Sequence, residues 1–262
     1  MSDVRHDAVR QVVRQQYSRV AESDACCSGP SCCGTSTPEA VSQALGYSAH
    51  ETAAVPAGAN MGLGCGNPHA IAALKPGETV LDLGSGGGFD CFLAARQVGD
   101  AGRVIGVDMT PAMLSKARAN AEQGGYANVE FRLGEIEHLP VADRSVDVIL
   151  SNCVINLSPD KPRVFAECFR VLKPGGRLAI SDVVAFADIP AHIQEDMALL
   201  TGCMAGATPL AELDETLRAL GFEGVRIAPK EESKSFIREW APGTAVTDYV
   251  VAATIEAVKP AP

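Results

Sequence analysis

A glycine-rich turn between an apolar run and a helical pattern constrains the fold of this chain more than any other segment. Residues 80–90 have the sequence VLDLGSGGGFD, so a buried strand ends directly in the turn. Gly84, Gly86 and Gly88 have no Cβ, so a ligand can approach the backbone closely. Asp108 ends the next predicted strand, where a carboxylate can accept both hydroxyls of a ribose. The pattern therefore favours a nucleoside-containing ligand at this turn.

Strands and helices alternate through the middle of the chain. Short apolar runs predict strands over 79–83, 103–107, 129–133, 145–150 and 177–181. Periodic apolar residues predict helices over 89–98, 111–123 and 161–172. This alternation predicts an α/β fold with a Rossmann-like parallel sheet and helices on both faces. Outside this region, helices are expected over 4–20, 37–45, 67–74, 190–204 and 210–220, and closing strands over 225–229 and 248–257.

Charge and composition exclude several classes of protein. The 22 basic and 32 acidic residues give a net charge of −10, which argues against nucleic-acid binding because that requires a basic face. The charged first ten residues have no apolar core, so no secretory signal is expected. The longest uncharged stretch, 52–74, contains prolines and glycines, so no membrane helix is expected either. We predict a cytoplasmic protein whose nine cysteines are mostly reduced thiols.

The glycine turn has two other interpretations. A nicotinamide-binding fingerprint needs a third glycine where this chain has Phe89, and a merely connecting turn does not explain Asp108. Four segments together resemble the class I S-adenosylmethionine-dependent methyltransferases across roughly 78–182: DLGSG at 82–86, VDM at 107–109, GEIE at 134–137 and RVLKPGG at 170–176. The resemblance implies S-adenosylmethionine as cofactor and a class I methyltransferase sheet.

The same resemblance implies a set of cofactor contacts. Gly84 and Gly86 would pass beside the methionine and ribose, and Asp108 would hold the ribose diol. Adenine would lie against Met109 and meet Glu135 and Ile136, the latter through its backbone N–H. By residue type alone, Met109 is as readily a core side chain. The remaining implied contacts are Asp82, Ser85 and Asn152.

Three cysteines lie at separated but suggestive positions. They are Cys65 in GCG, Cys153 directly after the fourth strand, and Cys203 on the helical segment after the sheet. Each cysteine taken singly is more often a small buried hydrophobe, which is the interpretation favoured for Cys91 and Cys168. No C-x-x-C pair indicates a zinc site. No pair of residues suggests a general base, so the acceptor of the methyl group is expected to need no deprotonation.

Three further segments make the chain similar to the arsenite methyltransferases over about 60–225. They are GCGNP at 64–68, SNCVINL at 151–157 and GCMAG at 202–206. The resemblance implies that Cys153 and Cys203 hold trivalent arsenic, with Cys65 as a third thiol. The resemblance also implies a fourth catalytic cysteine in the N-terminal segment. The candidates are Cys26, Cys27, Cys32 and Cys33, and we predict Cys33. A longer C-terminal region found in some members is expected to be absent.

The implied activity is methylation of arsenite and methylarsenite for arsenic detoxification, with a thiol reductant such as thioredoxin or glutathione as partner. Three segments are expected: N-terminal helices with a cysteine-rich loop over 1–60, the S-adenosylmethionine-binding domain over 61–182, and a cysteine-bearing substrate-binding lobe with closing strands over 183–262. Two alternatives stay open. One is a methyltransferase for an organic small molecule, and the other is a thiol-based metalloid-binding protein without turnover.

Overall fold

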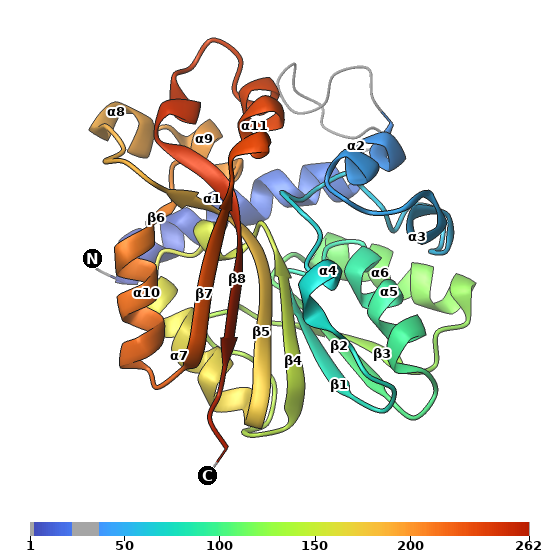
Figure 1. The fold of residues 1–262 in the computed structure, drawn as a ribbon. Helices are drawn as coiled ribbons and strands as arrows, with labels where there is room; N and C mark the ends of the chain where they lie inside the picture. Colours follow the sequence, from blue (N-terminus) through green and yellow to red (C-terminus); the bar gives the residue numbers. More distant parts are fainter. Residues whose placement is uncertain (1–2, 23–36, 262) are drawn as a thin grey trace.

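A computed structural model describes residues 3–22 and 37–261 of the chain, and Figure 1 shows a central sheet with helices around it. The strand order is β3-β2-β1-β4-β5-β8-β7, with β6 beside β5. The strands are β1 (Thr79–Leu83), β2 (Arg103–Asp108), β3 (Val129–Leu133), β4 (Val146–Asn152), β5 (Leu172–Ala185), β6 (Thr208–Pro209), β7 (Glu223–Lys230) and β8 (Val250–Val258). The strands from β3 to β5 pair in parallel, and β8 is antiparallel to β5 and β7. This order confirms the predicted Rossmann-like sheet.

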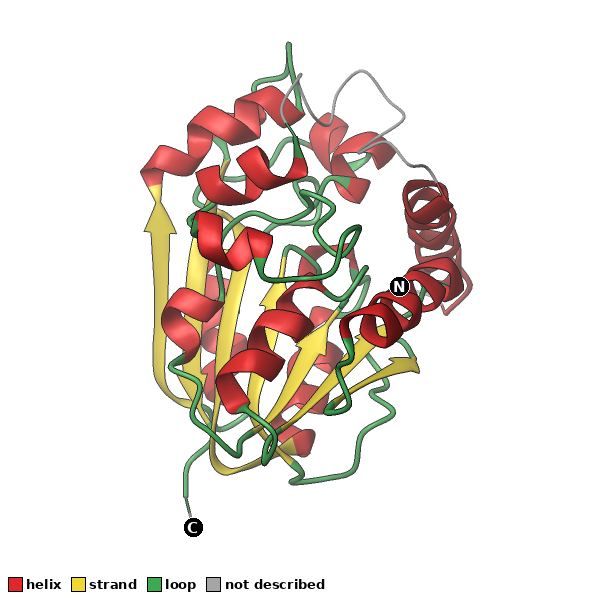
Figure 2. Ribbon diagram, turned by 90° about the vertical axis from the view of Figure 1, so that its right-hand side faces the viewer, coloured by secondary structure: helices red, strands yellow, loops and turns green. Residues whose placement is uncertain are grey.

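The helices lie on both faces of the sheet, as predicted (Figure 2). They are α1 (Asp3–Glu22), α2 (Pro38–Ala44), α3 (Ala49–Ala53), α4 (His69–Ala72), α5 (Phe89–Val98), α6 (Pro111–Gly124), α7 (Lys161–Val171), α8 (Ala191–Gln194), α9 (Met197–Thr201), α10 (Leu210–Ala219) and α11 (Lys234–Trp240). Three short 3-10 helices are η1 (Ile155–Leu157), η2 (Glu231–Ser233) and η3 (Val246–Asp248).

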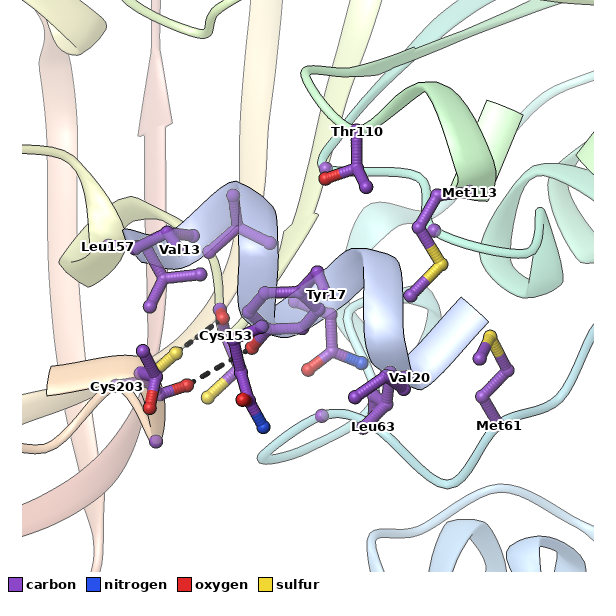
Figure 3. Close-up of a pocket in the computed structure, with 18 of the residues that line it drawn as sticks. Val13, Tyr17, Val20, Met61, Leu63, Thr110, Met113, Cys153, Leu157 and Cys203 are labelled. Atoms are coloured by element: carbon purple, nitrogen blue, oxygen red, sulfur yellow. Dashed lines mark hydrogen bonds between the residues drawn. The ribbon is translucent and has the colours of Figure 1, made fainter. Parts of the chain in front are cut away.

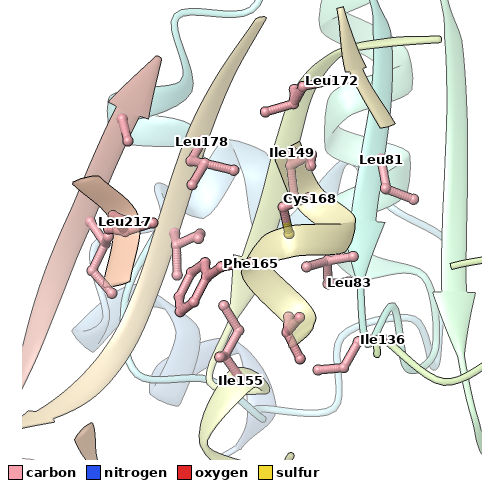
Figure 4. Close-up of a cluster of buried hydrophobic side chains, with 14 of the residues drawn as sticks. Leu81, Leu83, Ile136, Ile149, Ile155, Phe165, Cys168, Leu172, Leu178 and Leu217 are labelled. Carbon is pink, nitrogen blue, oxygen red and sulfur yellow. The ribbon is translucent and has the colours of Figure 1, made fainter. Parts of the chain in front are cut away.

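Two hydrophobic cores follow from the alternation of side chains along the strands. On one face, Leu81 and Leu83 of β1 pack with α7 and α10, where Phe165, Cys168 and Leu217 are buried (Figure 4). On the other face, alternate residues of the same strands pack with α5 and α6. Cys168 belongs to the first core and Cys91 to the second, which agrees with a packing position for both thiols.

The sheet continues across the boundary expected at 182. That boundary falls inside β5, and β7 and β8 from the last segment extend the same sheet. The division into three segments therefore stays a prediction about their roles. Among the described residues, no helix is both long and apolar enough to cross a membrane.

The helix predicted over 190–204 is wrong, because the structure has two short helices, α8 and α9, in its place. The cause is local. The Asp196 side chain accepts hydrogen bonds from the backbone N–H groups of Ala198 and Leu199, at 2.8 and 3.2 Å, and so starts a new helix. Helices α3 and α11 were also not predicted. The break places Cys203 in a loop after α9 rather than on a helix.

Candidate active site

A cavity of about 690 Å³ opens where the carboxyl ends of β1, β2 and β4 meet. The floor of the cavity is formed by the glycine turn after β1, the end of β2 and the loop after β4. The cavity is covered by α1, residues 59–64 and α9. Ligand crevices of doubly wound sheets lie at this edge. Among the predicted cofactor contacts, eight line the cavity: Asp82, Gly84, Ser85, Gly86, Asp108, Met109, Ile136 and Asn152.

The glycine turn has a backbone that only glycine adopts without cost. Gly84 has φ +66°, and a Cβ on it would overlap the methyl groups of Val154. The backbone N–H of Gly86 donates to Asp108 Oδ2 at 3.0 Å, and the N–H of Thr110 donates to Asp108 Oδ1 at 2.8 Å. Burial raises the pKa of Asp108, and these two hydrogen bonds reduce the rise. The turn and the carboxylate are thus held in one fixed arrangement.

The cavity residues fit S-adenosylmethionine. Ser85 Oγ is buried in the lining and has no hydrogen-bond partner among the described residues, so a ligand atom can satisfy it. Gly86 leaves space for a ligand against the backbone, since a Cβ on it would meet nothing within 4 Å. Asp108 lies at the end of β2, the position of a ribose-binding carboxylate in this fold.

Glu135 lies apart from the other predicted cofactor contacts, because it does not line the cavity. Its carboxylate pairs with two arginines of α1, with Arg10 Nε at 3.4 Å and Arg14 Nη2 at 3.3 Å. Glu137, two residues on, does line the cavity and is buried. The Glu135 carboxylate thus faces the N-terminal helix, and its contact with adenine stays a prediction.

A buried acidic corner at one end of the cavity was missed by the sequence analysis. Tyr47 donates to Asp90 Oδ1 at 2.6 Å, and His69 Nε2 lies 3.3 Å from the same oxygen. Cys91 Sγ donates to Asp82 Oδ2 at 3.2 Å. Burial, followed by the neighbouring charge of Asp90, raises the pKa of both Asp82 and Tyr47. Asp82 and Asp90 both line the cavity, so this end of it carries two neighbouring carboxyl groups.

The three suggestive cysteines converge beside the cavity. The ligand atoms of Cys65, Cys153 and Asp182 lie within 4.8 Å of one another. Cys203 Sγ donates to the backbone oxygen of Cys153 at 2.6 Å (Figure 3). Cys153 and Cys203 line the cavity, whereas Cys65 is buried next to them outside the lining. The gaps of 88 and 50 residues between these cysteines are therefore closed by the fold.

The chemical state of these thiols follows from their surroundings. Burial and then the neighbouring Cys153 raise the pKa of Cys65. The hydrogen bond with Cys203 is the main cause of the raised pKa of Cys153. Without a ligand, these groups are therefore neutral thiols near pH 7. A thiophilic centre replaces those protons with bonds to sulfur, which removes the cost of burying charge.

Helix α1 supplies the second group of residues that sequence reasoning missed. Its apolar stripe predicted a helix but not what the stripe covers. Val13 packs with Leu157 and Cys203, and Tyr17 lies against the same cluster (Figure 3). Tyr17 also donates to the backbone oxygen of Thr201 at 3.2 Å, which connects α1 to α9. Cys26, Cys27, Cys32 and Cys33 lie outside the described residues, so Cys33 stays a prediction.

A family model described as a methyltransferase domain matches residues 74–238. The fold and the cavity define the chain as an S-adenosylmethionine-dependent methyltransferase of class I. It is 54% identical over 97% of its length to an arsenite methyltransferase from Halobacterium salinarum, of which it covers 68%. It is 40% identical over 82% of its length to an arsenite methyltransferase from Aquipseudomonas alcaligenes, of which it covers 62%. The chain belongs to the arsenite methyltransferase family.

A solved structure agrees with this placement. An arsenic(III) S-adenosylmethionine methyltransferase from Chlamydomonas reinhardtii matches 85% of this chain and 74% of its own, with 34% identity and a TM-score of 0.65. A [4+2]-cyclase, 23% identical with a TM-score of 0.59, shares the fold alone. The same architecture is therefore shared by proteins of different activity.

Proposed function

We propose that this chain methylates trivalent arsenic held by the thiolates of Cys65, Cys153 and Cys203. The observation that carries the proposal is the convergence of these three thiols beside the cavity that fits S-adenosylmethionine. Soft sulfur ligands select a soft, thiophilic centre. Arsenite and methylarsenite are the proposed substrates, and arsenic detoxification is the proposed role.

The residues of the chain act by binding and positioning. Asp108 holds a ribose diol, Met109 and Ile136 meet the adenine, and Cys153 and Cys203 bring arsenic to the cavity wall. S-adenosylmethionine, when bound, supplies an electrophilic methyl group on a sulfonium. Trivalent arsenic on three sulfurs keeps a lone pair and carries no proton, so this site needs no general base. The products are methylated arsenic and S-adenosylhomocysteine.

A redox step belongs to the same proposal. Two thiols of the chain give two electrons to the pentavalent product and form a disulfide, which returns arsenic to the trivalent state. An external dithiol or thiol system, of the thioredoxin or glutathione type, reopens that disulfide by exchange. Cys33 is the proposed N-terminal participant, and the cytoplasm is the proposed compartment, because it maintains such reductants.

Cysteine-to-serine variants test the proposal. Cys153→Ser and Cys203→Ser are assayed for methylarsenical formation from arsenite and labelled S-adenosylmethionine, and we expect turnover to fall at least about 100-fold, since arsenic loses a sulfur ligand. Cys168→Ser is the matched control, because Cys168 is buried as Cys203 is but lies in the core between the sheet and α7. Unchanged methylarsenical formation in both site variants would overturn the proposed role of these thiols. Arsenite binding with no turnover in the parent would favour a metalloid-binding protein.

A further inference from the structure

Two asparagines flank Cys153, and their side chains bind the segments that carry the other two thiols. Asn152 is the last residue of β4, and Asn156 lies in η1. The segment with Cys153 thus contacts both the Cys65 loop and the Cys203 loop through side-chain amides.

Asn152 binds the backbone of the Cys65 loop on both of its polar sides. Its Oδ1 accepts the backbone N–H of Cys65 at 3.0 Å, and its Nδ2 donates to the backbone oxygen of Gly66 at 2.9 Å. Gly64 allows this approach, because a Cβ on it would lie 2.8 Å from Asn152 Nδ2. The amide therefore pairs with the loop as a neighbouring strand would, and it fixes the Cα of Cys65 relative to Cys153.

Asn156 does the same for the Cys203 loop. The Asn156 side chain is buried, with the residue 3% exposed. Its Nδ2 donates to the backbone oxygen of Val183 at 2.5 Å and to Asp182 Oδ1 at 2.9 Å. The same Nδ2 lies 3.2 Å from the backbone oxygen of Cys203. Gly206 packs directly on the backbone oxygen of Asn156, where a Cβ would not fit. The amide therefore ties the loop after α9 to β5.

We propose that Asn152 and Asn156 are positioning residues that set the spacing of the three arsenic-binding thiols. The inference rests on the proposed function and deepens it. Three-coordinate binding needs all three sulfurs within bonding distance of one atom, and each cysteine comes from a different loop. The two amides hold the Cys65 loop and the Cys203 loop against the segment that carries Cys153, so a single segment positions all three cysteines.

The proposal predicts the loss of one sulfur ligand at a time. Arsenite is added to the parent and the variants, and the sulfur neighbours of arsenic are counted by X-ray absorption. We expect three in the parent and two, with an oxygen in place of the third, in Asn152→Ala and in Asn156→Ala. Arsenite affinity should fall about 10- to 100-fold, the range found when groups that orient metal ligands are removed.

Two comparisons separate positioning from general damage. Asn128→Ala is the matched control, because Asn128 Nδ2 donates to the backbone oxygens of Ala95 and Gly99 at 3.3 and 3.0 Å, just before β3 and at the other end of the sheet. It should lose stability but keep three sulfur neighbours. Asn156 does not line the cavity, so Asn156→Ala should bind S-adenosylhomocysteine as the parent does.

The outcomes distinguish the two proposals. Three sulfur neighbours in both asparagine variants, with arsenite affinity within twofold of Asn128→Ala, would overturn the positioning role and leave the proposed function standing. Fewer than three sulfurs in the parent would overturn the proposed thiolate site itself. If Asn152→Ala does not fold, Asn152→Asp replaces it. That variant keeps an acceptor for the Cys65 N–H but loses the donor to Gly66, and three sulfurs in it at parent affinity would also overturn the role.

Discussion

The ion pair between Arg10 and Glu137 is expected to hold α1 over the cavity. Arg10 Nε and Nη2 donate to Glu137 Oε1 at 3.2 and 3.1 Å, and the Glu137 side chain is only 3% exposed. Removing one partner of a buried pair costs about 3–5 kcal/mol, because the other charge stays buried. Ser158 still donates to Glu137 at 2.7 Å, so we expect Arg10→Ala to cost less, about 2–3 kcal/mol.

Arg14→Ala is the matched control, because Arg14 lies on the same helix and, among the described residues, pairs with Glu135 alone, each side chain about one third exposed. Such a pair contributes about 0.5 kcal/mol or less. Hydrogen exchange of the α1 amides measures the difference: the opening constant should rise about 30- to 140-fold in Arg10→Ala, since 1.4 kcal/mol is tenfold. If α1 exchanges equally fast in both variants, the buried pair does not hold the helix.

Three further predictions follow from the site. Gly84→Ala should cost about 2–4 kcal/mol in urea unfolding, from a left-handed backbone and overlap with Val154; a cost under about 0.5 kcal/mol would contradict this. Burial raises the pKa of Cys65, and the hydrogen bond with Cys203 raises the pKa of Cys153. The alkylation of these two thiols by iodoacetamide should therefore keep accelerating above pH 9, and a plateau of the rate near pH 8.5 would contradict this prediction. Burial raises the pKa of Asp182 to about 6, so the folded state holds the proton more tightly than the unfolded chain. Stability should therefore fall by about 3 kcal/mol as pH rises from about 3 to about 7, and Asp182→Asn should lack that slope.

The sheet could be predicted from the sequence because its signals are local. β1, α5 and β3 have the predicted bounds, since each is a periodic apolar run bounded by glycine, proline or polar residues. The glycine turn and Asp108 were predicted for the same reason. The break at Asp196 was not, because its capping bonds compete with a helical pattern that continues on both sides.

The site was less predictable because its contacts join distant segments. An amphipathic stripe shows that α1 buries one face, but it does not show that Val13 covers Cys203. Glu135 and Glu137 match the same motif equally well, and only the position of α1 decides that Glu135 pairs with arginines. The convergence of the three thiols was expected from the resemblance alone, since spacings of 88 and 50 residues carry no geometry.

Backbone geometry gives an independent reason to assign the two cavity-lining thiols to function. Cys153 and Cys203 have φ values of 58° and 64°, in the left-handed region that favours glycine. A side chain there costs about 1 kcal/mol or more, so packing alone would select glycine at both positions. Hydrogen bonds hold each in place: the N–H of Cys153 donates to Ser181 at 2.8 Å and that of Cys203 to Leu200 at 2.9 Å. Cys91 and Cys168 lie within helices and show no such cost. Cys153 and Cys203 thus carry a backbone cost that the two packing cysteines do not, which supports a role for their sulfur atoms.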